Sequence, residues 1–538
     1  MYKKLPLLLF LVGMAVSCSG NKTQAEEPLR PRTIITTDGE CDDIDSFVRV
    51  LLYANDLDIQ GIVYSSSMWH WKGDGKGTLL LPENRAKREG PANPFMREPV
   101  PQESNRWIGE TWVQELIDKY GECLPNLLKH DSRYPSAEYL KSIVKMGNVR
   151  VEGDMTQPTE GSDFIRDLLL DDVPGPLYAQ IWGGSNTVAR ALLSIEEQYK
   201  GMAEWENVHK KVSDKLVLNI IQDQDGTYRT YIADAWPGVR VVCNASQFGC
   251  FAYMWRQTVP QQYLSLLDGD WFKENILEGH GPLMAEYLTL GSGYDINDPA
   301  DRYGDPEMVN RMPGAKMNDF ISEGDSPSYF VLFDFLGLRS LDHPDWGSAG
   351  GRYVLQEGTN LWRNTERPGG FRPSFGPRGA NPEPERPKEL FNRASGDFNP
   401  ASGEVDMFYP QTRWVEVLQN DFAARADWCV KDYADANHMP QVSVKGALDI
   451  TAKAGEKVVL KASALDPDGD DVALSWWQYR EAGTSDAVLD IKGAGTASAS
   501  FAVPADALPG STFHVILQGT DNGTPSLTHF QRVIVTIR

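Results

Sequence analysis

The segment TTDGECDDIDSF, residues 36–47, decides the fold of this 538-residue chain. The β-branched run TIITT, residues 33–37, overlaps its start and is typical of a buried strand. After the acidic turn, apolar side chains recur at the spacing of one helix face: Ile44, Phe47, Val48, Leu51 and Leu52. A second segment rich in apolar residues, LDIQGIVYSSS at 57–67, is predicted to be the next strand. This order predicts a βαβ unit, and therefore an α/β domain with a mostly parallel sheet and flanking helices.

The same pattern returns twice along the chain. PLYAQIWGG (176–184) precedes a helical segment at 185–199, and KLVLNIIQDQDG (215–226) is another apolar strand that ends in acidic residues. Because sites in open α/β sheets form at the carboxyl ends of strands, we expect these three strand ends to meet at one edge. Residues 69–110 break the pattern and are predicted to be an insertion over that edge, and residues 337–402 to be an ordered loop region.

The composition changes after about Met439. Short runs such as KVVLKASA, VALSWWQY and QRVIVTIR alternate apolar and polar residues and are separated by turn sequences. Residues 440–538 are therefore predicted to form an immunoglobulin-like β-sandwich, with the inner Trp of the WW pair in its core, and residues 32–435 to form the α/β domain. The turn DPDGDD allows a cation site, although a plain turn is its commoner role; its carboxylates are Asp466, Asp468, Asp470 and Asp471.

Residues 1–18 have the layout of a secretory signal, with two lysines, an apolar run and a small residue before Cys18. The segment AVSC at 15–18 resembles a lipobox, which predicts export and lipidation of Cys18, with residues 19–31 as a polar tether. Ordinary cleavage beside an incidental Cys is the alternative. The lipid anchor is then the expected membrane contact, on a protein held in the cell envelope.

The net charge of −23 disfavours nucleic acid as a partner, because the phosphate backbone would be repelled. The five cysteines after Cys18 are odd in number and scattered, so they predict no disulfide framework. Cys243 and Cys250 are close enough in sequence to pair, and buried free thiols are the alternative.

The strand-to-helix turn carries four carboxylates within eight residues, on Asp38, Asp42, Asp43 and Asp45. Such crowding is costly unless a cation or backbone donors compensate the charge. One Asp is explained by capping of the helix and another by a solvated face. A cluster of oxygen ligands is better explained by a hard divalent cation.

The run 38–43, Asp-Gly-Glu-Cys-Asp-Asp, resembles the Asp-Pro-Gly-x-Asp-Asp stretch of nucleoside hydrolases. Nearly the whole mature chain resembles the DUF1593 family, cellulose-binding-type proteins with a nucleoside-hydrolase-like domain. By position, the resemblance implies that Asp38 and Asp43 bind calcium, that Asp38 accepts a proton from water, and that Asp42 holds sugar hydroxyls. It also implies that the calcium shell is completed by the Trp182 carbonyl, before GGSN, and by Asp325 in EGDSPS.

Three positions depart from nucleoside hydrolases. Thr36 occupies a position where those enzymes have an additional Asp. Gly324 occupies the position where many of them have a His that helps the leaving base depart. The Asn that follows their second strand is replaced here by residues 67–69. The metal half of the site is thus retained and the leaving-group half is rebuilt. Release of a purine is therefore not expected.

The candidates for the rebuilt half lie near the predicted edge or in the insertion. They are His280 as a catalytic group and Asn186, Asp223, Asp225, Trp69 and His70 as substrate-binding groups. Each has a structural alternative. The glycines around His280 are also typical of a surface loop, and the sequence DQDG is also typical of a turn. The rings of Trp69 and Trp71 either stack on a sugar or pack the insertion onto the sheet.

The sequence therefore predicts a calcium-dependent hydrolase of glycosidic or N-glycosidic bonds, acting on a carbohydrate or nucleoside-like molecule with Asp38 as the base. The alternative is a carbohydrate-binding protein that has kept the fold and lost the chemistry. Nucleoside salvage is the least favoured function, because it fits poorly with a lipid-anchored protein outside the cytoplasm.

Overall fold

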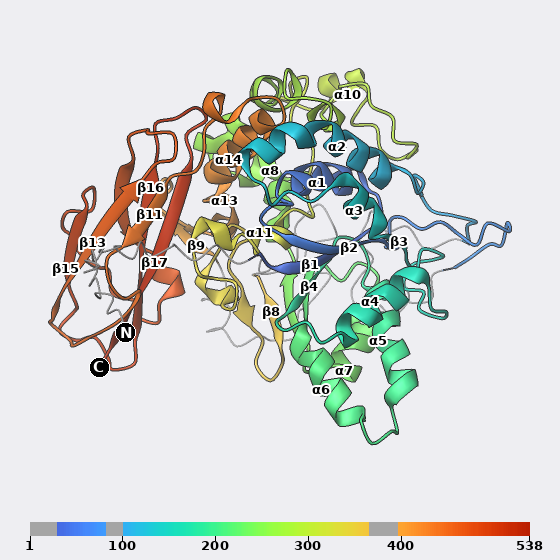
Figure 1. The fold of residues 1–538 in the computed structure, drawn as a ribbon, viewed down its shortest axis with the longest axis horizontal. Helices are drawn as coiled ribbons and strands as arrows, with labels where there is room; N and C mark the ends of the chain where they lie inside the picture. The colour runs from blue at the N-terminus through green and yellow to red at the C-terminus, as the bar shows by residue number, and fades with distance from the viewer. Residues whose placement is uncertain (1–29, 82–100, 365–395) are drawn as a thin grey trace, which may run out of the picture.

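The computed structural model describes residues 30–81, 101–364 and 396–538 (Figure 1). The predicted signal 1–18, the lipidation site Cys18 and nearly all of the tether 19–31 lie outside the described residues. No helix within the described ranges is long and apolar enough to cross a membrane.

The first domain is built on an eight-stranded sheet with the order β3-β2-β1-β4-β5-β6-β8-β7. All neighbouring strands are parallel except β7, which pairs antiparallel with β8. The strands are β1 Arg32–Thr37, β2 Asp58–Tyr64, β3 Val144–Met146, β4 Leu177–Ile181, β5 Leu216–Ile221, β6 Arg240–Asn244, β7 Val354–Leu355 and β8 Leu361–Arg363. The predicted α/β class with a mainly parallel sheet is confirmed.

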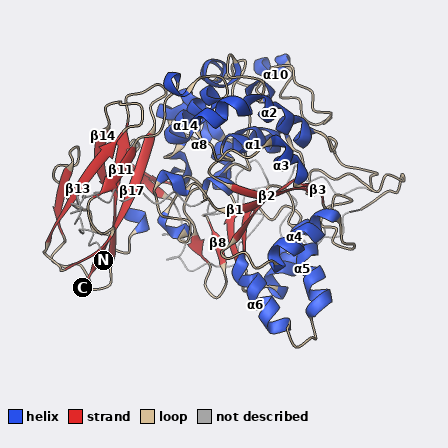
Figure 2. Ribbon diagram, in the orientation of Figure 1, coloured by secondary structure: helices blue, strands red, loops and turns tan. Residues whose placement is uncertain are grey.

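Helices cover both faces of this sheet (Figures 1 and 2). One face carries α1 Cys41–Leu52, α2 Trp112–His130, α3 Ala137–Ser142 and α14 Val415–Trp428, and the other carries α4 Glu160–Leu170, α5 Asn186–Tyr199 and α6 Trp205–Lys215. Every residue of α1 is buried, because this helix lies under α2 and α14. The acidic turn before α1 is therefore held in the centre of the domain.

A long segment of short helical turns follows β5. It comprises η2 Tyr228–Ile232, α7 Ala233–Ala235, η3 Gln247–Phe251, α8 Trp255–Thr258, η4 Gln261–Leu267, α9 Gly269–Phe272, η5 Lys273–Leu277, η6 Met284–Glu286, α10 Pro306–Arg311, α11 Pro327–Phe330, η7 Asp334–Leu336 and η8 Pro344–Trp346. The hairpin β9 Asp397–Asn399 and β10 Glu404–Asp406, then α13 Tyr409–Thr412, precede α14, and η9 Tyr433–Asp435 follows it.

Two sequence predictions are refined by these elements. The loop region predicted at 337–402 contributes β7 and β8 to the edge of the main sheet, while its part 365–395 lies outside the described residues. Cys243 and Cys250 do not pair, because both are free thiols in the structure, as are Cys41, Cys123 and Cys429. The buried-thiol alternative thus holds for Cys250, and Cys243 is half-buried.

The C-terminal domain consists of two sheets that enclose their own core. One has the order β11-β13-β15 and the other β12-β17-β16-β14, with all pairs antiparallel except β12 and β17. The strands are β11 Gln441–Val444, β12 Asp449–Ala452, β13 Lys457–Leu465, β14 Ala473–Gln478, β15 Ser498–Ala502, β16 Thr512–Thr520 and β17 Thr528–Ile537. Trp476 lies in this core, as predicted for the inner Trp of the WW pair. In the DPDGDD turn, Asp466 accepts hydrogen bonds from the backbone of Asp468 and Asp470, as in a plain turn.

Polar groups buried between the two domains join them. Arg532 of β17 donates to the Leu338 carbonyl at 2.6 Å and to the Gly347 carbonyl at 2.9 Å. Tyr479 donates to Asp397 at 2.7 Å. Arg532 and Tyr479 would lose these acceptors if the domains separated, so the contact favours one orientation of the two domains.

His514 makes this junction sensitive to acid. It is buried, its Nδ1 accepts a hydrogen bond from Arg532, and burial together with Arg532 lowers its pKa to about 3. A histidine with a lowered pKa in the folded state stabilises the protein above the unfolded pKa of about 6.5, and this contribution is lost as the pH falls toward 3. Relative to His514→Gln, which keeps an acceptor but cannot titrate, the wild type should lose about 2 kcal/mol between pH 7 and pH 5.

Urea unfolding of both proteins at pH 5, 6 and 7 measures this difference. His529, whose pKa burial lowers to about 4, is present in both proteins, so its contribution cancels. If the free energy of unfolding falls equally with pH in the two proteins, His514 is not a buried neutral histidine.

Candidate functional site

The acidic turn is fixed by the first residues of α1. Glu40 is the N-cap, and Asp43 accepts hydrogen bonds from the backbone N–H of Asp38 at 3.2 Å, from that of Glu40 at 3.1 Å and from the Thr37 hydroxyl. The N-cap is therefore Glu40 and not an Asp, and Asp43 takes part in capping as the third helical residue of a capping box. Three donors converge on this carboxylate, so its position is set by the backbone and does not depend on a ligand.

Asp42, Asp43 and Asp325 come together at this edge of the sheet. One carboxylate oxygen from each lies within 4.8 Å of the others, and all three side chains are buried. Burial raises the pKa of each of them well above its usual range, and repulsion from neighbouring carboxylates raises it further. Three buried carboxylates at this spacing need either protons or a cation.

Two glycines make room for the carboxylates. A Cβ on Gly183, in the turn after β4, would lie 2.7 Å from Oδ1 of Asp38. A Cβ on Gly324 would lie 2.5 Å from Oδ2 of Asp42, which accepts a hydrogen bond from the Ser322 hydroxyl at 3.3 Å. Gly324, at the position where many nucleoside hydrolases have a His, is thus packed directly against the Asp42 carboxylate.

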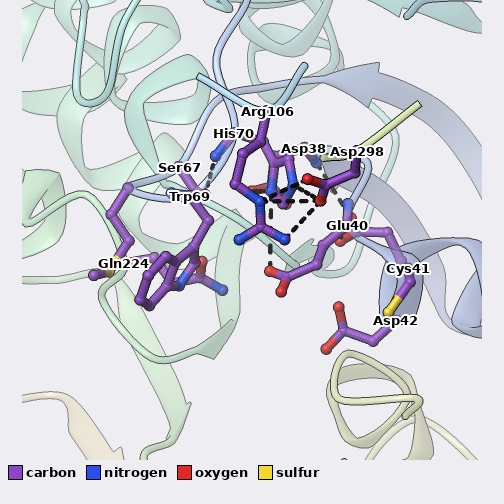
Figure 3. Close-up of polar contacts among 12 residues, drawn as sticks. Asp38, Glu40, Cys41, Asp42, Ser67, Trp69, His70, Arg106, Gln224 and Asp298 are labelled. Carbon is purple, nitrogen blue, oxygen red and sulfur yellow. Dashed lines mark hydrogen bonds and ion pairs between the residues drawn. The ribbon is translucent and has the colours of Figure 1, made fainter. Parts of the chain in front are cut away.

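Asp38 faces a histidine from the insertion. Nδ1 of His70 lies 3.6 Å from Oδ2 of Asp38, and Nε2 lies 3.2 Å from Asp298, which Arg106 also contacts at 2.6 Å (Figure 3). Although burial disfavours the imidazolium, Asp298 and Asp38 raise the pKa of His70 to about 10. Burial opposes ionisation of Asp298, but His70 and Arg106 hold its pKa below the usual range. At neutral pH the insertion thus brings a positive charge to Asp38.

The insertion is a two-armed extension whose arms run antiparallel. Backbone bridges join Trp71 to Asn105 and Leu80 to Gln102, and residues 82–100 between them lie outside the described part. Arg106 follows directly with a φ of 48°, a left-handed conformation that costs a non-glycine residue about 1–2 kcal/mol. The ion pair with Asp298 offsets this strain, which is typical of a functional position.

The remaining acidic and amide candidates are engaged in the fold. Nδ2 of Asn186 donates to the Asn148 carbonyl at 2.7 Å, and its Oδ1 accepts from Ser65 at 2.8 Å. Asp225 accepts from the Asn186 backbone at 2.9 Å, and Asp223 accepts from Arg229. The turn alternative accounts for both aspartates, and Asn186 ties the strand ends together.

Two other predicted residues lie apart from these contacts. His280 contacts Asp427 near the end of α14 at 3.2 Å and the Glu274 carbonyl at 2.9 Å, and so is not brought to the acidic cluster. Trp69 is half-buried and lies beside Gln224 in Figure 3. Gln224 donates to the Trp182 carbonyl at 2.6 Å, so this expected calcium ligand already has a partner.

Sequence reasoning missed Glu40, Arg106 and Asp298. Glu40 belongs to the quoted acidic segment, and its position at the N-cap was a usable signal. Arg106 and Asp298 are 192 residues apart and meet only through the fold, so no local pattern marks them.

The cluster fits a calcium ion by its geometry and its donor chemistry. Two oxygen ligands of one calcium lie at most about 5.2 Å apart, and the three carboxylates meet this limit. Asp43 and Asp325 belong to the ligand set that the resemblance implies, and Asp42 joins them where Asp38 was expected. Within the described ranges, no other group of three His, Cys, Asp or Glu side chains has ligand atoms that all lie within 4.8 Å of one another.

Comparisons with known proteins agree with this architecture. Residues 32–353 match the family described as cellulose-binding Sde182, nucleoside hydrolase-like domain, and residues 457–537 match the C-terminal domain of the cellulose-binding protein Sde0182. No curated protein is significantly similar to the chain.

One solved structure shows the same fold. A nucleoside hydrolase-related hypothetical protein from Saccharophagus degradans, associated with carbohydrate metabolism, is 24% identical, with a TM-score of 0.62, over 95% of this chain and 100% of its own. The effector protein XOO4466 is 9% identical over 75% of this chain and 95% of its own, and its TM-score of 0.32 supports no argument. On the family match, which spans strands β1 to β6 and all three carboxylates of the cluster, the chain belongs to the cellulose-binding Sde182 family with a nucleoside hydrolase-like domain.

Proposed function

We propose that the protein binds a carbohydrate at the edge of the main sheet, where Asp42, Asp43 and Asp325 hold a calcium ion. The observation that carries the proposal is the meeting of three buried carboxylates whose charge the fold leaves to be compensated. The family description as cellulose-binding supports a saccharide ligand. A calcium ion supplies open coordination positions that sugar hydroxyls can fill in place of water.

The residues of the chain have separate tasks in this proposal. Asp43 is held by its three hydrogen-bond donors, and it therefore fixes the position of the cluster relative to the start of α1. Asp42 has one oxygen held by Ser322 and is placed to accept hydrogen bonds from sugar hydroxyls as well. The many carboxylates disfavour anionic ligands, so a neutral sugar is the preferred ligand.

We also propose that the protein is exported and lipidated at Cys18. Metabolic labelling with radioactive palmitate tests this: the wild type should be labelled and the Cys18→Ser variant should not.

Hydrolysis of a glycosyl bond is the second candidate, and the pair of Asp38 and His70 favours it. Oδ2 of Asp38 and Nδ1 of His70 are both buried and have no hydrogen-bond partner in the described structure. Their separation of 3.6 Å is too long for a direct hydrogen bond, so a water or a substrate hydroxyl is needed to join them. Asp38 would accept the proton of the attacking water, and His70 would help to hold that water against Asp38.

Isothermal titration with neutral oligosaccharides of glucose, xylose and arabinose, with calcium or with a chelator, tests the proposal. The wild type should bind at least one of them, and Asp42→Ala or removal of calcium should weaken binding by roughly 100-fold. Assaying the same mixtures for new reducing ends separates the two candidates, because hydrolysis should disappear in Asp38→Ala while binding remains. If no oligosaccharide binds with calcium present, the proposal is wrong.

A further inference from the structure

A pair of stacked tyrosines stands beside the acidic cluster. Tyr253, between η3 and α8, lies parallel to Tyr303 with ring centroids 5.5 Å apart and 24° between the planes. The hydroxyl of Tyr253 lies 3.2 Å from Sγ of Cys41 and donates to Glu40 at 3.4 Å. Glu40 is the N-cap of α1 and Cys41 its first residue, so Tyr253 contacts the two residues that directly precede Asp42.

The exposure of this ring is unusual for so constrained a side chain. Tyr253 is 38% exposed, although one face is covered by Tyr303 and its hydroxyl is held by α1. A ring fixed at both places loses little conformational entropy when a ligand covers it. The exposed surface is therefore organised for contact before any ligand arrives.

The surrounding groups define the chemistry of a matching ligand. A sugar ring has an apolar face of C–H groups and an edge of hydroxyls, and aromatic rings bind such faces by close contact. Glu40, whose side chain is 21% exposed, and Asp42 offer acceptors to the hydroxyl edge. In the view of Figure 3, Trp69 and Glu40 are drawn on the same side of Asp42.

We propose that Tyr253 is the stacking platform of the carbohydrate site, and that it receives the ring of a neutral sugar whose hydroxyls point to Glu40 and Asp42. This assignment rests on the proposed function and adds the place and the class of the sugar. A uronic acid is disfavoured, because its carboxylate would lie among Glu40, Asp42 and the cluster.

The test measures the affinity of three variants for one oligosaccharide, the one that the wild type binds most tightly. The measurement is isothermal titration with calcium present. Tyr253→Ala should weaken binding by roughly tenfold or more, and Tyr253→Phe, which keeps the ring, by less than about threefold. Tyr139→Ala removes a tyrosine that is 39% exposed on α3 and should leave the affinity unchanged. Calcium affinity should equal that of the wild type in all three, which separates loss of the platform from loss of the fold.

Each other result decides against the assignment. If Tyr253→Ala binds the sugar as tightly as the wild type, the platform is wrong while the proposed function stands. If the wild type binds no sugar at all, the proposed function and the platform fail together. If an oligogalacturonate binds as tightly as the neutral sugars and loses affinity in Tyr253→Ala, the class of sugar is wrong.

Discussion

In the Asp325→Asn variant, the metal-free protein is expected to melt at a higher temperature than the wild type, and calcium is expected to add almost no further stability. The substitution keeps the shape of the side chain and removes one of three buried carboxylates that repel each other. The same change removes a charged ligand, so calcium should bind at least roughly 100-fold more weakly. Stability and metal affinity thus move in opposite directions.

Differential scanning calorimetry with a chelator and with calcium measures both effects. Asp298→Asn is the matched control, because Asp298 lies between two cations, His70 and Arg106. Removing its charge should destabilise the metal-free protein by about 3–5 kcal/mol and leave the stabilisation by calcium in place. A lower melting temperature of Asp325→Asn in the chelator, with an undiminished response to calcium, would refute the cluster as a cation site.

The Arg49→Met variant is expected to lose about 3–5 kcal/mol of folding stability, because it leaves a buried carboxylate without its cation. Arg49 of α1 is fully buried and donates at 2.6 Å to Glu323 and at 2.6 Å to Gln419 of α14. Glu323 lies two residues before Asp325, and it also accepts hydrogen bonds from Tyr287 and Ser326. The ion pair therefore ties the chain carrying Asp325 to the helix that carries Asp42 and Asp43.

Urea unfolding measures the loss of folding stability in the variant. Calcium titration measures whether the variant also binds calcium more weakly at the cluster. The double variant Arg49→Met with Glu323→Gln should recover part of the loss, because no buried charge then remains unpaired. If the single variant stays within about 1 kcal/mol of the wild type, the ion pair between Arg49 and Glu323 does not stabilise the fold as expected.

The strand, turn and helix around residues 36–47 were predictable because each follows from local spacing and from β-branched or acidic residue types. The resemblance implied Asp43 and Asp325 as neighbours, and the structure brings them together. Arg106 and Asp298 were not predictable, because their pairing depends on how the insertion folds back over the sheet. Asn186 follows a strand end, as a ligand-binding residue would, but the sequence does not show that other strand ends consume its hydrogen bonds.

The close approach at Gly324 constrains how this site changes by mutation. Any side chain there displaces the Asp42 carboxylate, since the Cβ alone would lie 2.5 Å from its oxygen. A histidine at position 324 therefore becomes acceptable only when the Asp42 side chain turns away from it. Position 324 thus limits the orientations open to Asp42: with glycine there, the carboxylate lies directly against the backbone, and a side chain at 324 would hold the same aspartate in another orientation.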